Sequence, residues 1–249
     1  MSLLVTGASG YLGRELLGRT DAVGISSADV DIRDQSAVAA LLERLHPEAV
    51  IHTAYRRDDR ATTVDGAVHV AAAAAGARLV HVSTDVVFDG EKGEPYVEED
   101  EPTPLTDYGR AKADAERAVL DAHPGAVVVR TSLIYGGSES GPQERLAADP
   151  DASFFTDEVR CPIQVGDLAD ALVELTRMQV AGVLHVAGAD RLSRREFAEL
   201  LAGYPVRAAS SSDSGLVRPR VCSLAIDRAR GLLRTRLRGA REVLGVQHP

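Results

Sequence analysis

A glycine-rich turn near the N-terminus constrains the fold of this chain more than any other feature. Apolar residues 3–6 predict a short buried strand, the run TGASGYLG occupies residues 6–13, and a helical pattern follows directly. In such a turn Gly7 permits a tight bend, Gly10 lets a ligand approach the backbone, and Gly13 lets the helix pack closely. Strand, turn and helix in this order predict a binding site for the pyrophosphate of a dinucleotide at the helix N-terminus, where N–H groups and the helix dipole attract anions.

The rest of the first half alternates short apolar strands with amphipathic helices. Because such an alternation places helices on both faces of a parallel sheet, the sequence predicts an α/β protein with a Rossmann-type, doubly wound parallel sheet. Further strands are expected at residues 22–25, 49–53, 79–83, 126–131 and 182–186, and helices at residues 12–17, 34–45, 64–75, 108–120 and 167–177.

After residue 135 the regular alternation loosens. Residues 136–151 and 208–214 are interpreted as loops, and Ser193 and Glu196 have the spacing of a helix-capping box. A chain of 249 residues is long enough for one large domain and a small lobe. We therefore expect a small C-terminal substrate-binding lobe beside the dinucleotide-binding domain. The expected division assigns residues 1–135 and 164–186 to the domain, and residues 136–163 and 187–249 to the lobe.

Composition narrows the choice of partners. The 37 acidic and 28 basic side chains give a formal net charge of −9, which repels a nucleic-acid backbone. Cys161 and Cys222 form no CxxC pair, so neither a disulfide framework nor a zinc site is indicated. The acidic run at residues 98–101 is interpreted as a solvated loop, so no metal is expected. With no apolar segment long enough for a membrane, we expect a cytoplasmic monomer or homodimer that binds a small molecule and neither nucleic acid nor membrane.

The second predicted strand bears on the choice of cofactor. An enzyme selective for NAD carries an acidic residue near the end of this strand, but this chain has Ser26 and Ser27 there. NADP(H) is therefore permitted. Because no arginine clearly replaces the missing acid, NADP(H) and NAD(H) both stay open. We expect Asp31 and Ile32 to lie against the adenine ring.

A tyrosine and a lysine have a spacing that suits proton transfer. Tyr108 and Lys112 are four residues apart in a predicted helix and so share one face of it. A free phenol has a pKa near ~10, and an adjacent cation stabilises the phenolate. The segment at residues 83–85 ends the fourth predicted strand, where ligands bind in such folds. This order of features predicts that Tyr108 is an acid able to protonate a substrate.

Several motifs together resemble the dTDP-4-dehydrorhamnose reductase family, a part of the extended short-chain dehydrogenase/reductase class. The resemblance covers nearly the whole chain, and the motifs follow one another in the same order as in the family. It rests on STDVVFDG at residues 83–90, DEP at 100–102, YGRAK at 108–112, RTSLIYG at 130–136, CPIQVGDLA at 161–169, Arg218-Pro219 and Leu224.

The resemblance implies a role for each site residue. Thr84 and Asp85 would polarise or position the substrate carbonyl, Tyr108 would donate the proton, and Lys112 would hold the nicotinamide ribose, while the hydride comes from the cofactor. Residues 53–55 match the segment that runs beside the pyrophosphate and ribose. The full set of expected cofactor contacts is Gly7, Ser9, Gly10, Tyr11, Leu12, Gly13, Asp31, Ile32, Thr53, Ala54, Tyr55, Ser83, Tyr108 and Lys112.

The same resemblance implies a nucleotide-linked 4-keto-sugar as substrate, and some positions depart from it. Leu133 stands where the family shows tryptophan, Val86 where it shows tyrosine, and Thr63 where it shows asparagine, while residues 137–153 form a shortened region. A different or smaller substrate therefore stays open. Val86 and Leu133 are expected near the substrate, and Arg160 is a candidate contact to a substrate anion.

Two other functions stay open beside the reductase. A sugar-nucleotide epimerase has the same fold and tyrosine, with a serine at the position of Thr84, and would retain its hydride. A non-catalytic, cofactor-binding regulatory subunit like the beta subunit of methionine adenosyltransferase shares the turn, although Thr84, Tyr108 and Lys112 are intact here. A dehydratase is excluded because Val86 stands where that class carries a glutamate.

Overall fold

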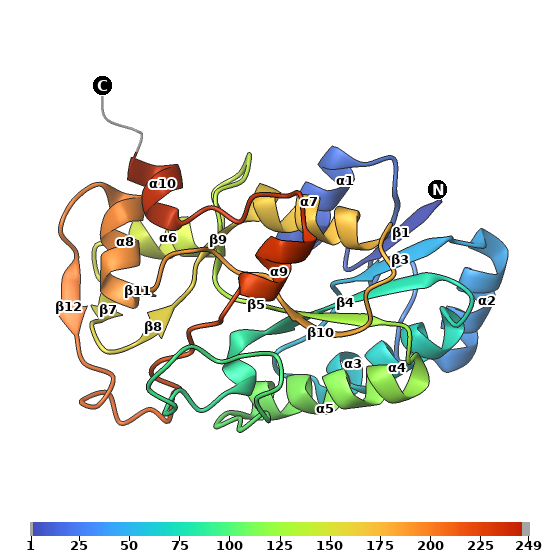
Figure 1. Ribbon diagram of the computed structural model, residues 1–249, viewed down its shortest axis with the longest axis horizontal. Helices are drawn as coiled ribbons and strands as arrows, with labels where there is room; N and C mark the ends of the chain where they lie inside the picture. Colours follow the sequence, from blue (N-terminus) through green and yellow to red (C-terminus); the bar gives the residue numbers. More distant parts are fainter. Residues whose placement is uncertain (1, 246–249) are drawn as a thin grey trace. The chain divides into compact units, whose positions relative to one another are not determined.

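A six-stranded sheet forms the centre of the first of two compact units in the computed structural model, which describes residues 2–245. The strand order is β10-β5-β4-β3-β1-β2, and helices cover both faces (Figure 1). The predicted Rossmann-type parallel sheet is confirmed. The strands are β1 (Leu3–Thr6), β2 (Val23–Ile25), β3 (Ala49–His52), β4 (Arg78–Thr84), β5 (Val127–Thr131) and β10 (Gly182–His185).

The strand order reverses at β1. Val5 lies opposite Gly24 of β2 on one side and opposite Ile51 of β3 on the other, and all three strands run parallel. β3 in turn pairs with β4, where His52 lies opposite His81. In an open parallel sheet, the point at which the order reverses leaves a crevice at the carboxyl ends of the strands. The glycine turn therefore follows β1 at the position where a ligand site is expected.

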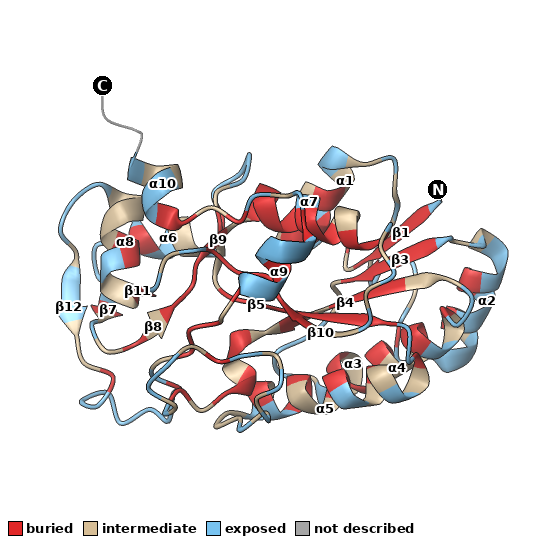
Figure 2. Ribbon diagram, viewed as in Figure 1, coloured by how far each residue is buried: buried red, intermediate tan, exposed pale blue. Residues whose placement is uncertain are grey.

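Helices of this unit bury one face each against the sheet. Leu4, Val50, Leu79 and Val128 in the strands are at most 1% exposed and share a core with apolar residues of α2, α4 and α5 (Figure 2). Asp34 caps α2 by accepting a hydrogen bond from the N–H of Ala37, as its position in the sequence predicts. The helices are α1 (Tyr11–Arg19), α2 (Gln35–Leu45), α3 (Arg60–Thr63), α4 (Asp65–Ala73), α5 (Asp107–Ala122) and α7 (Val165–Leu175).

The second unit consists of three short strand pairs and four helices, with a one-turn helix η1 (Asp85–Val87). Its apolar cluster is centred on Tyr135 and Phe197, whose rings meet edge to face at 5.2 Å. The paired strands are β6 (Ile134–Tyr135) with β9 (Ile163–Gln164), β7 (Ser153–Phe155) with β12 (Arg207–Ala209), and β8 (Val159–Arg160) with β11 (Leu192–Ser193); the helices are α6 (Pro142–Ala147), α8 (Arg194–Ala202), α9 (Asp227–Leu232) and α10 (Ala240–Gly245).

Two segments expected as loops contain regular structure. Residues 136–151 include α6, which begins with proline at a position where a missing N–H costs nothing and packs Ala147 against Ala198 of α8. Residues 208–214 include part of β12, a strand too short to stand alone that forms by pairing with β7. The loop interpretation was wrong for residues 142–147 and 208–209, because tertiary partners stabilise these short elements, and it holds for the rest of both segments. The capping box of Ser193 and Glu196 is confirmed at the start of α8.

The two units differ in their bounds from the sequence-based division. Within the described residues, the first contains residues 2–84, 107–130 and 169–184, and the second contains residues 85–106, 131–168 and 185–245. Residues 85–106 therefore pack with the second unit. A substrate-binding role for that unit stays a prediction. Among residues 2–245, no helix combines the length and apolar character that a bilayer crossing requires.

Candidate active site

Close packing around the turn after β1 requires glycine at two positions. Gly7 has a φ of 74°, and a Cβ there would lie 2.7 Å from the backbone nitrogen of Ala54. A Cβ on Gly13 would lie 2.2 Å from the carbonyl oxygen of Gly7, so this glycine packs against the turn itself. Gly10 precedes α1 and donates its N–H to that same oxygen at 2.9 Å. The first N–H groups of an α-helix have no partner within the helix, and groups of this kind can bind an anion.

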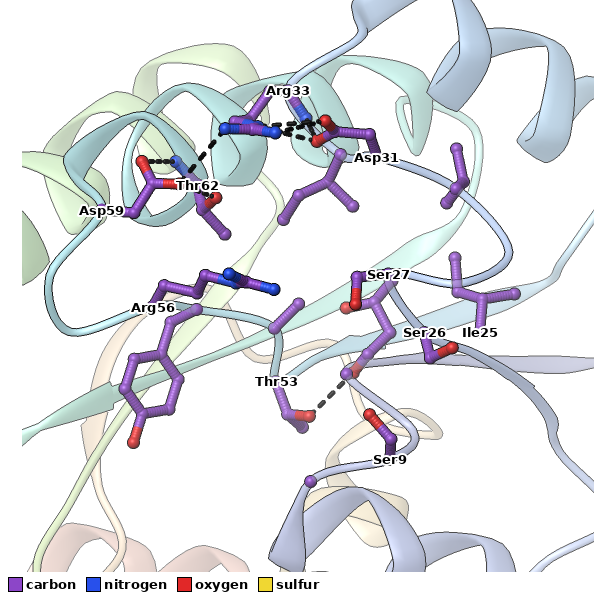
Figure 3. Close-up of a pocket in the computed structure, with 17 residues that line it drawn as sticks. Ser9, Ile25, Ser26, Ser27, Asp31, Arg33, Thr53, Arg56, Asp59 and Thr62 are labelled. Atoms are coloured by element: carbon purple, nitrogen blue, oxygen red, sulfur yellow. Dashed lines mark hydrogen bonds and ion pairs between the residues drawn. The ribbon is translucent and has the colours of Figure 1, made fainter.

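A pocket of about 430 Å³ opens beside this turn (Figure 3). It collects residues that follow β1, β2 and β3, as the reversal of strand order predicts. Of the expected cofactor contacts, Gly7, Ser9, Gly10, Asp31, Ile32, Thr53, Ala54 and Tyr55 line it. Tyr11, Leu12 and Gly13 are not among the lining residues, and the Leu12 side chain is buried in the core. Any contact from those three positions would come through the start of α1.

Charged side chains on one wall of the pocket are linked by ion pairs. Arg33 forms a 2.6 Å ion pair with Asp31 and lies 3.4 Å from Asp59 (Figure 3). The hydrogen bonds from Arg33 lower the pKa of Asp31 to about 2. Asp59 also caps α3 through Thr62. Asp31 is therefore charged at neutral pH and already held by a guanidinium.

Tyr108 and Lys112 lie one turn apart on α5 next to this pocket. The ring of Tyr55, which lines the pocket, lies 5.6 Å from the ring of Tyr108, and its centroid is 5.8 Å from Lys112 Nζ. Lys112 is 2% exposed and donates a hydrogen bond to the carbonyl oxygen of Val82 at 2.6 Å. Burial lowers the pKa of Lys112 to about 8. Tyr108 and Lys112 thus share a helix, as the spacing predicts, and both lie near Tyr55, which lines the pocket.

Two histidines of the sheet lie in the same buried region. His52 forms a 2.6 Å hydrogen bond with Thr6 through Nδ1 and stacks on His81 at 5.2 Å. Burial and then the charge of Lys112 lower the pKa of His52 to about 3 and that of His81 well below its usual range. Both rings are therefore neutral at physiological pH, because protonation would place a further positive charge near Lys112 in a buried region.

The carboxyl end of β4 is occupied by a buried polar network. The hydroxyl of Ser83 donates to Glu116, and Glu116 forms a 2.9 Å ion pair with Arg130. The Ser83 side chain is therefore engaged within the protein, so the expected contact with a cofactor would have to use its backbone. Thr84 ends β4 and is partly buried.

Asp85 and Arg160, both expected at the substrate, are buried in the second unit, and their roles toward a substrate stay predictions. The Asp85 carboxylate is 3% exposed, accepts a hydrogen bond from Ser132 at 2.6 Å, and lies 3.8 Å from the Arg160 guanidinium. Arg160 is equally buried and donates to three backbone carbonyls, those of Val159, Pro219 and Arg220. Both charges are thus satisfied inside the second unit, where they fix the backbone. The burial of these two side chains could not be judged from the sequence.

Val86 and Leu133 also belong to the second unit. Val86 lies in η1 and is partly buried, while Leu133 packs against the apolar cluster around Tyr135 and Phe197. Their expected proximity to a sugar stays a prediction.

Two adjacent arginines were missed by the sequence analysis. Arg56 lines the pocket, and the guanidinium of Arg57 lies 4.5 Å from the centroid of the Tyr108 ring. Both follow Tyr55 directly after β3, where the expected contacts stop at residue 55. The only signal was the pair of cations at the end of a strand that borders the predicted site.

A parallel sheet with a phosphate-binding turn at its switch point, and a tyrosine–lysine pair beside the resulting pocket, define a Rossmann-type, dinucleotide-dependent oxidoreductase. The model of the RmlD substrate binding domain family matches residues 1–222. With most of its length matched, the chain belongs to the dTDP-4-dehydrorhamnose reductase family, as its motifs indicate.

Similar proteins carry related names. A probable dTDP-4,6-dihydroxy-2-methyloxan-3-one 4-ketoreductase of Streptomyces antibioticus is 33% identical over 288 residues, covering 100% of this chain and 98% of the relative. A dTDP-4-dehydrorhamnose reductase of Mycobacterium tuberculosis is 37% identical over 219 residues, covering 77% and 71% of the two chains. The crystal structure of a dTDP-4-dehydrorhamnose reductase from Bacillus anthracis in complex with NADP has a TM-score of 0.88 and 28% identity, and the match covers 98% of each chain.

Proposed function

We propose that this protein uses NADPH or NADH to reduce the keto group of a nucleotide-linked 4-keto-sugar, with Tyr108 as proton donor. The observation that carries this proposal is the position of Tyr108 and buried Lys112 beside a pocket that begins at the glycine turn. The names of the Streptomyces and Mycobacterium relatives support a sugar nucleotide as substrate. The NADP complex of the Bacillus relative supports the cofactor.

The residues of the pocket fit a nicotinamide dinucleotide. The turn around Gly10 and the start of α1 would hold the pyrophosphate, because N–H groups there have no helical partners. Ile32 would lie against the adenine, and Tyr55 connects the pocket with the tyrosine–lysine pair. A side chain at Gly7 or Gly13 would collide with backbone atoms and deform this turn. When bound, the reduced cofactor supplies the hydride.

Proton donation falls to Tyr108. Its hydroxyl protonates the oxygen of the reduced carbonyl, and the phenolate left behind needs a nearby positive charge. Lys112 supplies that charge from the same face of α5, and its hydrogen bond to the Val82 carbonyl fixes the ammonium in place. Arg57 adds a second positive charge, and its guanidinium lies 4.5 Å from the centroid of the Tyr108 ring.

Thr84 and the two apolar residues remain part of the substrate proposal. Thr84 would bond the carbonyl from the end of β4, and Val86 and Leu133 would contact the sugar. Because neither of those two side chains is aromatic, the proposal predicts weak selection by ring stacking and a dependence on the nucleotide for affinity. Asp85 acts in this account as a positioning residue through Ser132 and Arg160.

The direct test mixes the protein with NADPH or NADH and a panel of dTDP-4-keto-sugars and follows the absorbance of the reduced cofactor. We expect steady oxidation with at least one sugar, and Tyr108→Phe should lose activity by roughly 100-fold or more while binding the cofactor normally. Conversion of a sugar without net oxidation would indicate an epimerase. Cofactor binding without any turnover would indicate a regulatory subunit, and either result would contradict the proposal.

A further inference from the structure

Arg56 differs from the other charged residues of the pocket. The pocket is lined by two acids and two arginines, and Arg33 is paired with both acids, Asp31 and Asp59. Within residues 2–245, no carboxylate lies within ion-pair distance of the Arg56 guanidinium. Figure 3 shows the Arg56 side chain extending into the pocket toward the side that carries Ser26 and Ser27. Arg56 is therefore the arginine of the pocket lining whose guanidinium is not in an ion pair with a lining carboxylate.

Buried Thr63 fixes the backbone from which this side chain extends. Its hydroxyl donates to the carbonyl oxygen of Arg56 at 2.7 Å and accepts from the N–H of Arg56 at 3.2 Å. Thr63 is 1% exposed and lies in α3, whose first turn is capped by Asp59. An asparagine, which the family shows at this position, would place its polar atoms further from its own backbone than a threonine does. We regard Thr63 and Arg56 as a linked pair.

The opposite side of the pocket provides neutral hydrogen-bonding groups and no competing acid. Ser26 donates from its N–H and hydroxyl to Asp29, which turns that carboxylate away from the pocket lining. The hydroxyl of Ser27 has no partner in the described part of the chain, and its side chain is exposed at the pocket wall. A ribose placed between the glycine turn and Ile32 would direct its 2′ position toward these serines, because they follow β2.

We propose that Arg56, with Ser27, binds the 2′-phosphate of NADPH and makes the protein selective for NADPH over NADH. This inference rests on the proposed function, since it assumes a dinucleotide in the pocket. A phosphate monoester carries close to two negative charges and accepts hydrogen bonds from a guanidinium in a fork geometry. NADH lacks that group and would leave the Arg56 charge without a partner. Thr63 acts as a positioning residue for Arg56.

The experiment measures binding of fragments that need no catalysis. Adenosine 2′,5′-bisphosphate and adenosine 5′-monophosphate are titrated into the wild-type protein and into Arg56→Gln by calorimetry. We expect the wild type to bind the bisphosphate more tightly, and Arg56→Gln to lose on the order of 10- to 100-fold in bisphosphate affinity with little change for the monophosphate. Arg56→Lys should retain part of the preference because its charge remains.

Matched variants identify the cause of any change. Arg60 lies four residues further along, is 61% exposed, pairs with Asp114, and does not line the pocket, so Arg60→Gln should leave both affinities unchanged. Thr63→Val, which keeps the shape of the side chain, should weaken the bisphosphate without weakening the monophosphate. Ser27→Asp should reverse the preference, because a carboxylate there repels the phosphate and accepts hydrogen bonds from ribose hydroxyls.

The outcomes separate this inference from the proposed function. If neither fragment binds the wild type, the dinucleotide site itself is wrong. If both bind equally well, or if Arg56→Gln and Arg60→Gln behave alike while remaining folded by circular dichroism, the dinucleotide site stands and the role of Arg56 is overturned.

Discussion

At the scale of single residues, the ammonium group of Lys112 is buried in the protein. Burial brings its pKa down to about 8, so the ammonium loses its proton within an accessible pH range. We expect kcat/KM, which reports the free enzyme, to fall as the pH rises above about 8, because neutral Lys112 cannot stabilise the Tyr108 phenolate. Lys112→Arg should move this alkaline limb upward. A profile that stays flat to pH 10 in the wild type would contradict this role for Lys112.

Lys112 should also affect how the free energy of unfolding depends on pH. The pKa of Lys112 is lower in the folded chain than its ordinary value of 10.5, so the unfolded chain holds this proton more tightly between about pH 8 and pH 10.5. The destabilisation that buried Lys112 causes is present below pH 8 and diminishes as the pH rises through this window. Its contribution to the pH dependence of unfolding should disappear in Lys112→Met.

Arg57 offers a second test at this scale. Its guanidinium lies 4.5 Å from the centroid of the Tyr108 ring. An exposed cation–π contact of this kind contributes about 0.5–1 kcal/mol, so Arg57→Gln should lower kcat roughly 2- to 5-fold at saturating cofactor. Steady-state kinetics measures this, with Arg60→Gln as the control. An unchanged kcat together with weaker cofactor binding would show that Arg57 binds and does not assist Tyr108.

At the scale of elements, the turn between β1 and α1 depends on Gly13. An alanine there would bring its Cβ to 2.2 Å from the Gly7 carbonyl oxygen, so the turn must open to accept it. We expect Gly13→Ala to destabilise the protein by roughly 1–3 kcal/mol and to weaken cofactor binding at least tenfold. Denaturant unfolding and cofactor titration measure the two effects.

Gly18 provides the matched control in the same helix. A Cβ on Gly18 would meet no described atom within 4 Å, so Gly18→Ala should stabilise α1 by roughly 0.5–1 kcal/mol and leave cofactor binding unchanged. Equal effects of the two substitutions would contradict the packing that the turn shows.

The paired strands β3 and β4 place two histidines in the core of the sheet. Neither ring nitrogen of His81 has a hydrogen-bond partner among the described residues. The pKa values of both histidines are lowered on folding, so the unfolded chain binds more protons below pH 6.5. Stability should therefore fall as the pH decreases from about 6.5 toward 3.

His81→Leu tests this reading of the strand pair. Replacing a buried polar ring that lacks partners by an apolar side chain of similar size should stabilise the protein by about 1 kcal/mol and reduce the loss of stability at low pH. Urea unfolding at pH 7 and pH 5 provides the measurement. Marked destabilisation at both pH values would show that His81 has a partner that the protein alone does not contain.

The sequence predicted elements better where periodicity and turn chemistry act locally. The TGASGYLG turn, the α2 cap at Asp34 and the α8 capping box all depend on neighbouring residues, and all three form as expected. In contrast, α6 and β12 depend on packing against α8 and pairing with β7, which no local pattern reveals. Element boundaries also shifted: the helix expected at residues 64–75 is α4 (Asp65–Ala73), and α3 (Arg60–Thr63), which precedes it, was not predicted.

The candidate site, too, was predicted where it consists of short motifs and was not predicted where it depends on contacts between residues far apart in the sequence. The phosphate turn and the Tyr108–Lys112 pair are short motifs, so residue spacing predicted them. The buried partners of Asp85 and Arg160 are Ser132 and three carbonyls, and no local pattern reveals them. Arg56 was missed because it reaches the β2 side of the pocket from the end of β3.

At the scale of the whole molecule, membership of the family and the geometry of the site support one central claim. The family match spans residues 1–222 and so includes segments of both compact units. The claim is that a hydride passes from the cofactor to a sugar ketone while Tyr108 delivers the proton. A reductase transfers that hydride to the product, an epimerase retains it, and a regulatory subunit transfers none.

The most direct measurement follows the hydride itself. NADPH deuterated at the transferred position is incubated with the protein and a dTDP-4-keto-sugar, and the product is analysed by mass spectrometry and NMR. We predict one deuterium on the former carbonyl carbon of the sugar for each cofactor oxidised, and almost none with Tyr108→Phe. A converted sugar without deuterium, or deuterium transfer at the wild-type rate with Tyr108→Phe, would contradict the account.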